Sequence, residues 1–193
     1  MTITMEDARR AAIDALYEDY AKTIVLQQLA QGKRLVPGRG PLDSPLVVVG
    51  EAPGEQEDRE GRPFVGPSGG LLKRLFTRAR LPWEMCYVMN VLPWRPPGNR
   101  TPYPFEIHAS WPRVSAEIAV IDPLVVIAAG SSAWKGVTAL EMGKFADARF
   151  RWHSLESRRL LAIPHPSAIL RAPDGERSRM EDATVDALRQ ARS

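Results

Sequence analysis

The chain has 193 residues, 44% of them hydrophobic, which suits one domain with a sizeable core. Its single cysteine, Cys86, excludes an internal disulfide and any all-cysteine metal or iron–sulfur site built by one chain. The pI of about 9.2 fits nucleic-acid binding, but a net charge of +3 is too small to establish it. No apolar run approaches the ~18 residues of a membrane span, and the N-terminal stretch lacks a signal-peptide core, so we expect a cytoplasmic protein.

Helical and strand-like patterns alternate along the chain. In chain order they predict a helix over 5–31, a strand over 45–50, a helix over 68–79, a strand over 87–91, a helix over 103–121, a strand over 124–128, a short helix after Gly130, a strand over 160–163 and a helix from about 175 to 192. In the third long helix we expect five apolar residues to face the core, namely Ile107, Trp111, Val114, Ile118 and Ile121. The alternation predicts a single α/β domain over residues 1–193, a three-layer α/β/α sandwich around a four-stranded parallel sheet.

Three loops, residues 50–66, 90–102 and 164–171, follow predicted strands at their carboxyl ends. In an open parallel sheet these ends share one edge, where ligands usually bind. Each loop also carries polar residues that a core would not accommodate. We therefore expect the three loops to converge on one site.

The first loop combines glycines with carboxylates, and Phe64 offers a flat apolar face. In the second, Asn90 supplies one acceptor and two donors, which suits the edge of a nucleobase. In the third, prolines on both sides of His165 restrict the backbone and fix the direction of the imidazole. Each feature also has a structural interpretation: a solvated acidic turn, Phe64 as a core plug, and His165 as a turn cap.

Other motifs are absent from the sequence or favour structural roles. There is no P-loop and no GxGxxG opening a helix, and the GSSAW run lacks a hydrolase elbow, so we interpret Ser131 and Ser132 as helix caps. His108 on a helix face and His153 in a surface loop are interpreted as structural. Three separated histidines have no metal-ligand spacing, so we expect no metal site.

Together, the segments GEAPGEQEDREGRPFVG, NVLPWRPPGNRTP and HPSAILR resemble the three signature regions of the uracil-DNA glycosylase superfamily, with family 4, the iron–sulfur type, as the best match. The resemblance runs from about residue 24 to residue 171, in the same order and spacing. It implies a three-layer fold around a four-stranded parallel sheet. It also implies an enzyme that removes uracil from DNA.

The resemblance assigns roles to particular residues. Phe64 would stack on the flipped base, Asn90 would read the polar edge of uracil, and His165 would hydrogen-bond its O2 as the base leaves. Glu57 matches the acidic position associated with excluding a C5 methyl group, and Glu51 matches a carboxylate proposed to position water. The remaining expected contacts are Ala52 and Gly54 at the base, and Arg95, Arg100, Ser167, Leu170 and Arg171 at the DNA.

The sequence departs from family 4 at its cluster cysteines. The matching positions hold Ile24, Gln27, Trp94 and Trp111, and Cys86 matches none of them. We therefore expect no iron–sulfur cluster and no other cofactor, with tryptophan packing in the place of the cluster. A related subgroup that cross-links to DNA carries a basic insertion after the Asn loop, which this chain lacks, so we expect no stable covalent adduct.

These observations favour a monomeric, monofunctional glycosylase that acts on uracil in single- or double-stranded DNA, with no membrane partner. Two alternatives stay open. One is the same fold acting on another modified or deaminated base. The other is a DNA- or protein-binding relative that lost catalysis with the cluster.

Overall fold

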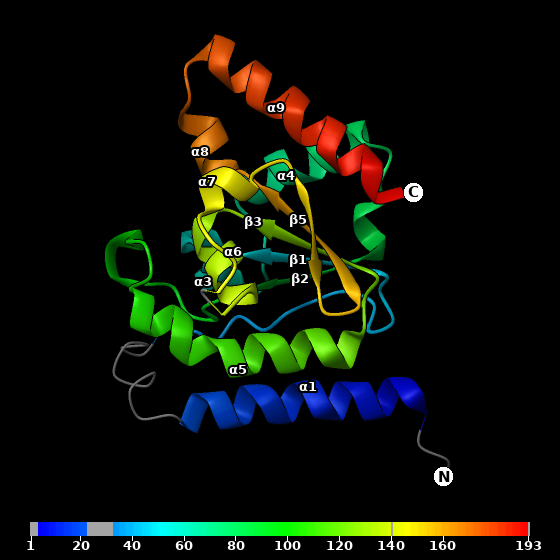
Figure 1. The fold of residues 1–193 in the computed structure, drawn as a ribbon. Helices are drawn as coiled ribbons and strands as arrows, with labels where there is room; N and C mark the ends of the chain where they lie inside the picture. Colours follow the sequence, from blue (N-terminus) through cyan, green and yellow to red (C-terminus); the bar gives the residue numbers. More distant parts are fainter. Residues whose placement is uncertain (1–3, 23–32, 140, 193) are drawn as a thin grey trace.

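The structure, a computed structural model, describes residues 4–22, 33–139 and 141–192, and it is an α/β fold built on one sheet (Figure 1). In sheet order the strands are β2 (Cys86–Asn90), β1 (Leu46–Gly50), β3 (Val125–Ala129), β5 (Arg158–Ile163) and β4 (Trp152–Leu155). The first four are parallel and overlap the four predicted strands, which confirms the predicted fold class.

The fifth strand, β4, corrects the predicted count of four and pairs antiparallel with β5 at the edge of the sheet. It also places His153 in a strand, not in a surface loop. The sequence did not predict this strand for two reasons. No residue of β4 is fully buried, so no apolar run marks it. The connecting residues Glu156 and Ser157 also lack the Asn-Gly or Asp-Gly signal of a tight hairpin.

The helices alternate with the strands. They are α1 (Met5–Lys22), α3 (Glu55–Glu60), α4 (Pro67–Arg78), α5 (Pro104–Ile121), α6 (Ser131–Val137), α7 (Phe145–Ala148), α8 (Pro166–Arg171) and α9 (Asp174–Arg189). Short 3₁₀ turns occur at Trp83–Met85, Pro97–Asn99 and Gln190–Arg192. The first predicted helix is described only as far as Lys22, so the predicted positions Ile24 and Gln27 lie outside the described residues. No helix in the described ranges has the length and apolar character needed to cross a membrane.

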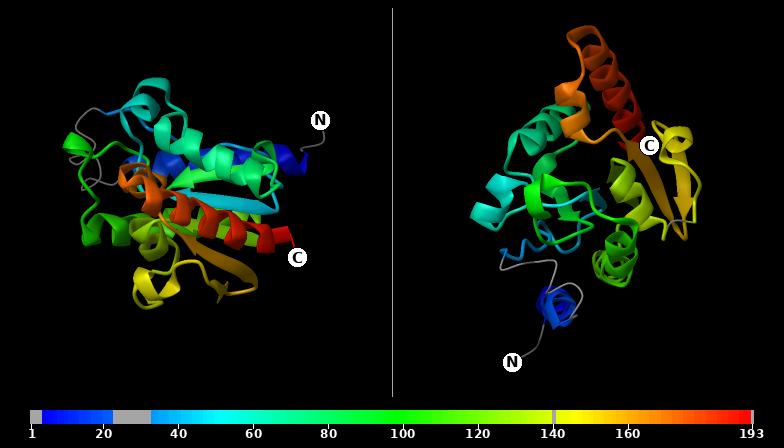
Figure 2. Two further views of the ribbon diagram at one scale, coloured as in Figure 1. Left: turned by 90° about the horizontal axis from the view of Figure 1, so that it is seen from above. Right: turned by 90° about the vertical axis from the view of Figure 1, so that its left-hand side faces the viewer.

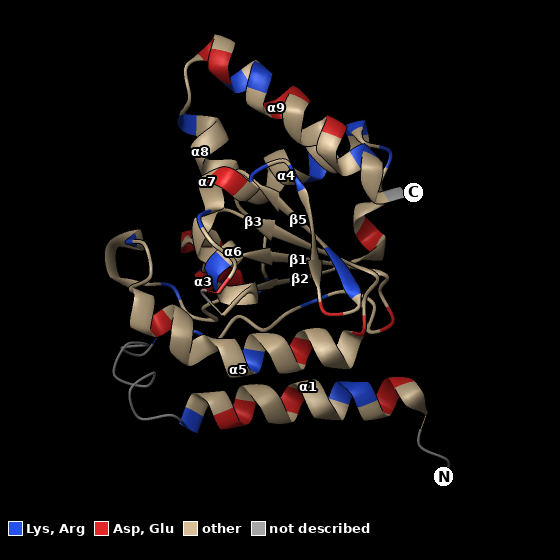
Figure 3. Cartoon of the chain, in the orientation of Figure 1, with Lys and Arg blue, Asp and Glu red and all other residues tan. Residues whose placement is uncertain are grey.

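Helices cover both faces of the sheet, and strand side chains alternate between them. Val47 and Val49 of β1 belong to the core beneath α5 and α6, whereas Val48 packs on the opposite face with α4 and α9. Figure 2 shows α4 and α9 lying across that second face, and α1 lies against the outer side of α5. Charged residues of both signs are spread over α1 and α9 (Figure 3). This packing leaves the carboxyl ends of the parallel strands free to carry the three loops.

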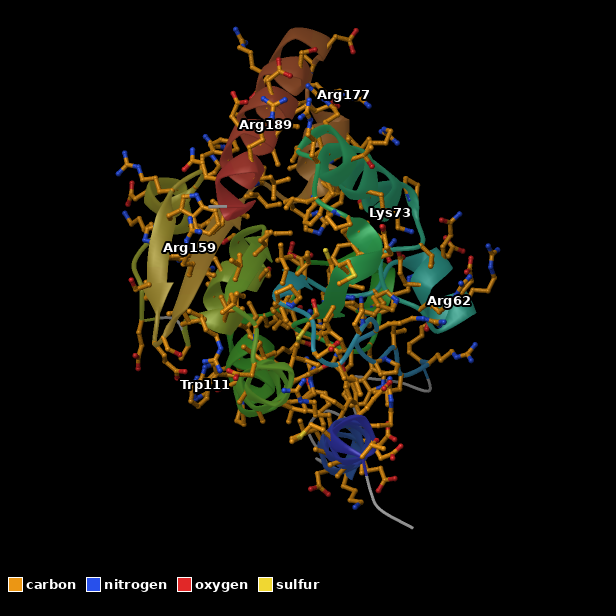
Figure 4. The ribbon with its side chains drawn as sticks, turned by 90° about the vertical axis from the view of Figure 1, so that its right-hand side faces the viewer. Arg62, Lys73, Trp111, Arg159, Arg177 and Arg189 are labelled. Atoms are coloured by element: carbon orange, nitrogen blue, oxygen red, sulfur yellow. The ribbon has the colours of Figure 1, made fainter. Side chains whose placement is uncertain are left out.

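The two tryptophans at expected cluster positions behave differently. Trp94 is buried, and its ring stacks on Tyr20 of α1 with centroids 5.1 Å apart. Trp111 is 38% exposed, and Figure 4 labels it on the flank of α5. The prediction that Trp111 faces the core was wrong because α5 buries the polar residues Ser110, Arg113 and Glu117, which rotates the helix away from its apolar stripe.

These two tryptophans provide a matched pair for a stability test. Trp94→Ala should lower the free energy of unfolding by about 3 kcal/mol or more, because it opens a cavity against Tyr20. Trp111→Ala should cost about 1 kcal/mol or less, because its side chain is partly solvated. Urea denaturation of both variants measures the difference, and equal losses would contradict the idea that Trp94 packing stabilises this region.

Candidate active site

The three loops meet around one cavity of about 460 Å³ at the carboxyl ends of β1, β2 and β5. Figure 2 (right) looks onto this side of the molecule. Most of the expected site residues line the cavity, namely Glu51, Ala52, Gly54, Glu57, Phe64, Asn90, Arg100, His165, Ser167 and Arg171. Arg95 and Leu170 do not line it.

Phe64 is buried at the wall of the cavity, where its ring packs edge-on against Trp83 at 5.9 Å. Its backbone has φ of +54°, in the left-handed region, which for a bulky residue costs about 1–3 kcal/mol and persists only under tight packing. That packing comes from Gly69 of α4, where a Cβ atom would lie 2.0 Å from the Phe64 carbonyl oxygen. The ring is therefore held in a fixed orientation.

Asn90 ends β2 and approaches Phe64 across Gly50. A Cβ atom on Gly50 would lie 2.4 Å from the Asn90 Oδ1 atom and 2.7 Å from the Phe64 ring, so only glycine permits this approach. In the described part of the chain, the Asn90 side-chain amide has no hydrogen-bond partner, although the residue is only 5% exposed. A buried amide that lines a cavity and has no partner among the described residues is available to pair with a ligand.

A buried network fixes the backbone beneath Asn90. The Arg113 guanidinium donates to the carbonyl oxygens of Asn90 and Val91, each at 2.7 Å, and forms an ion pair with Glu117. The Tyr17 and Tyr87 hydroxyls also donate to Glu117, at 3.0 and 2.7 Å. Burial raises the pKa of both phenols well above their ordinary value, so they stay protonated as donors. Arg113 therefore positions Asn90 without reaching the cavity.

Glu57 holds the first loop closed. One of its carboxylate oxygens accepts the Gly54 N–H at 3.1 Å, and the other accepts the Gly66 N–H at 2.8 Å. These N–H groups lie at the starts of α3 and α4; α3 lies within the predicted loop over 50–66, and α4 overlaps the predicted helix over 68–79. Because both oxygens are engaged, the observed contacts of Glu57 shape the loop that carries Phe64.

Glu51 faces the same cavity and accepts a hydrogen bond from the Ser132 hydroxyl at 2.6 Å. Ser132 is buried in the first turn of α6, after β3. The interpretation of Ser131 and Ser132 as helix caps was wrong, because the Ser132 hydroxyl donates to Glu51 and no side chain caps this helix. No sequence motif marks this contact, since the two residues are 81 positions apart.

His165 is the N-cap of α8, a helix where the sequence had predicted a loop. Its Nδ1 atom accepts the Ser167 N–H at 3.2 Å and lies 2.7 Å from the Ser167 hydroxyl. The neutral ring therefore carries its proton on Nε2. Burial lowers the pKa of His165 below 6.5; the charge of Glu51 acts in the opposite direction, and that of Arg171 adds to the lowering. At neutral pH the ring is thus an uncharged donor.

The arginines of the loops differ in how far their charges are already paired with protein carboxylates. Arg95 donates to Asn99 at 2.7 Å and faces Glu55 and Asp58 at 3.7 and 3.9 Å. Arg100 makes two hydrogen bonds with the buried Glu106 carboxylate, at 2.7 and 2.8 Å.

Arg171 is exposed at the cavity and has no ion-pair partner within the described residues. It is therefore the most available cation for a phosphate.

The comparison with known families decides how this arrangement is classified. A family model described as "Uracil DNA glycosylase superfamily" matches residues 37–189, well over half of the chain. The chain belongs to this superfamily.

Membership of the uracil-DNA glycosylase superfamily makes the chain a glycosylase, a hydrolase of N-glycosidic bonds, with DNA as its substrate. The chain is similar to the "Type-4 uracil-DNA glycosylase" of Thermotoga maritima, at 37% identity over 149 residues, 76% of this chain and 77% of that protein. The protein of the same name from Pyrobaculum aerophilum is 36% identical over 151 residues, covering 73% and 76%. That from Sulfurisphaera tokodaii is 34% identical over 156 residues, covering 76% and 70%. These relatives confirm the resemblance to family 4.

The iron–sulfur cluster implied by that resemblance does not fit the residues of this superfamily member. The chain has one cysteine, and Cys86 lies buried at the start of β2, at the opposite end of the strand from Asn90. Burial raises the pKa of its thiol to about 12, which disfavours the thiolate that a metal requires. In the described ranges, no group of three or more His, Cys, Asp or Glu side chains is arranged to hold a metal ion.

The pKa of His165 can be measured without any assumption about activity. An NMR titration should give a midpoint below 6.5, with the signal assigned by its loss in His165→Gln. Arg171→Gln should raise the midpoint and Glu51→Gln should lower it, because the two charges act with opposite signs. A wild-type midpoint at or above 6.5 would contradict the neutral donor.

Proposed function

We propose that this glycosylase removes uracil from DNA as a monomeric, monofunctional enzyme of base-excision repair, and that it works without an iron–sulfur cluster. The names of the curated relatives, at 34–37% identity, support uracil as the base. The observation that carries the proposal is that the Phe64 ring, the Asn90 amide and the His165 ring line the same cavity. These groups supply a stacking face, an edge reader and a donor for one flipped base.

Charge development explains the need for these groups. Breaking an N-glycosidic bond builds negative charge on the departing base and positive charge on the sugar. In the proposal, His165 donates through Nε2 to the uracil O2, and its neutral state at pH 7 favours this role. Glu51, fixed by Ser132, favours the sugar cation and orients the attacking water. No covalent nucleophile is needed.

Base recognition is assigned to Asn90 and Phe64, which line the same cavity. Asn90 would accept and donate along the polar edge that distinguishes uracil from cytosine, while Phe64 stacks on the ring. Glu57 would act indirectly, by shaping the loop at Gly54 and Gly66 against which a C5 methyl group would press. Ala52 and Gly54 would complete the wall.

The DNA backbone would be held at the rim. Arg171 and Ser167 line the cavity. Leu170 lies on the same helix, α8, and is partly buried against the core. Arg95 and Arg100 would contribute less, because both already face carboxylates. Trp94 packing on Tyr20 is proposed to take over part of the structural role of the cluster.

Uracil release tests the proposal directly. An end-labelled oligonucleotide with one uracil is incubated with the protein in the presence of a chelator, and alkaline cleavage reveals abasic sites. Wild type should release uracil, whereas Asn90→Ala and His165→Ala should each lose about a hundredfold in kcat or more. Thymine, hypoxanthine and normal-base substrates are the controls.

The other outcomes discriminate between the alternatives. Release of hypoxanthine but not uracil would assign another base to the same fold. A folded protein that binds DNA but releases no base would favour the binding-only relative. Activity that disappears with the chelator would contradict cluster independence.

Ser132 should affect the reaction through Glu51. Ser132→Ala should lower kcat about tenfold at unchanged KM, because one hydrogen bond to a carboxylate contributes about 1.5 kcal/mol. Ser131→Ala, which changes the exposed neighbour, is the matched control, and equal effects of both variants would contradict this role.

A further inference from the structure

Two aromatic rings lie exposed at the start of α5. Tyr103 is 49% exposed and Phe105 is 53% exposed. Their rings are stacked within 15° of parallel, with centroids 5.7 Å apart. We call this pair the rim platform. The pair places flat apolar ring faces at the surface, where they can stack on another flat ring.

The rim platform is built rigidly. The buried Glu106 carboxylate accepts the Tyr103 backbone N–H at 2.6 Å, and the same carboxylate holds both terminal nitrogens of Arg100. The Arg100 guanidinium in turn lies over the Tyr103 ring, 3.9 Å from its centroid. Burial alone would raise the pKa of Glu106, but the hydrogen bonds from Arg100 and Tyr103 lower it. The Glu106 carboxylate is therefore charged at neutral pH. Proline on each side of Tyr103 restricts its backbone further.

The rim platform is also close to the cavity. Arg100 lines the cavity on one side and contacts Tyr103 on the other, so one side chain separates the platform from the site. The loop that precedes α5 projects from the body of the molecule on the cavity side (Figures 1 and 2). Basic residues mark this loop and the end of α8 in Figure 3. The platform is thus joined to a residue of the cavity lining, although neither of its rings lines the cavity itself.

We propose that the rim platform is a stacking subsite for an unpaired nucleobase that neighbours the flipped nucleotide, and that it biases the enzyme towards single-stranded DNA. The inference rests on the proposed function. A base has a free face for stacking only when it is out of a duplex, because in a duplex both faces are covered by neighbouring pairs. Aromatic stacking combined with a nearby guanidinium is the chemistry by which proteins hold single strands without reading sequence.

A nucleobase fits this surface better than an apolar protein segment. The platform consists of two rings and is bordered by the charged Arg100, and the exposed His108 follows Phe105 by three residues on α5. An occupant must therefore be flat, about the size of one ring system, and attached to an anionic chain. A base in single-stranded DNA meets all three conditions.

The test compares uracil release from one sequence as a single strand and as a duplex. Replacing both rings, Tyr103→Leu with Phe105→Leu, keeps apolar side chains but removes the flat faces. This variant should raise KM for the single strand about tenfold, in the range measured for one lost base–aromatic stack. Its kcat on the single strand and its KM for the duplex should stay at the wild-type values. Trp111→Ala, an exposed aromatic of the same helix away from the cavity, is the control and should change neither.

A binding measurement separates the platform from catalysis. A single-stranded oligonucleotide carries a tetrahydrofuran abasic analogue flanked by 2-aminopurine, whose fluorescence is quenched on stacking. Wild type should quench it, and the double Leu variant should not. This fluorescence measurement still tests the stacking subsite if the wild type releases no uracil, because that outcome overturns only the proposed function. Unchanged quenching in the double variant, or an equal loss on single strand and duplex, would overturn the stacking subsite.

Discussion

A buried charge at the carboxyl end of β2 is the constraint on which the site depends. The Arg113 guanidinium holds the carbonyl oxygens of Asn90 and Val91, where the strand ends and the second loop begins. Glu117 balances the charge and is itself held by the hydroxyl of Tyr17, which comes from α1. Because breaking such a pair leaves an uncompensated buried charge, at a cost of about 3–5 kcal/mol, the helices and the strand end are coupled.

The same coupling extends to Trp94, which stands at a position where the sequence resemblance implies a cluster cysteine. Arg113 lies 5.3 Å from the Tyr20 ring, Tyr20 stacks on Trp94, and the Tyr20 hydroxyl lies 2.6 Å from the Ser110 hydroxyl. A network of aromatic contacts and hydrogen bonds thus connects α1, α5 and the second loop to the backbone of Asn90. Buried contacts thus fix the backbone of Asn90, while its side-chain amide has no hydrogen-bond partner among the described residues and is available to a ligand.

The sequence was sufficient to predict the parallel strands and the meeting of the three loops, because apolar strand runs and their order determine which ends share an edge. It could not predict the β4 strand, whose side chains are only partly buried. Nor could it predict the orientation of Trp111, which depends on the buried polar face of α5. The contact of Ser132 with Glu51 was missed because it joins the first turn of α6 to a loop 81 positions earlier in the chain, and only the fold brings the two together.

The central claim is that the cavity between the three loops receives a flipped uracil. The most direct measurement is a crystal structure of the protein with a single-stranded oligonucleotide that carries one 2′-fluoro-2′-deoxyuridine, whose glycosidic bond resists cleavage. The expected result is a uracil ring on the face of Phe64, with its polar edge at the Asn90 amide and its O2 towards His165. A uracil bound outside this cavity, or left stacked among its neighbours, would contradict the claim.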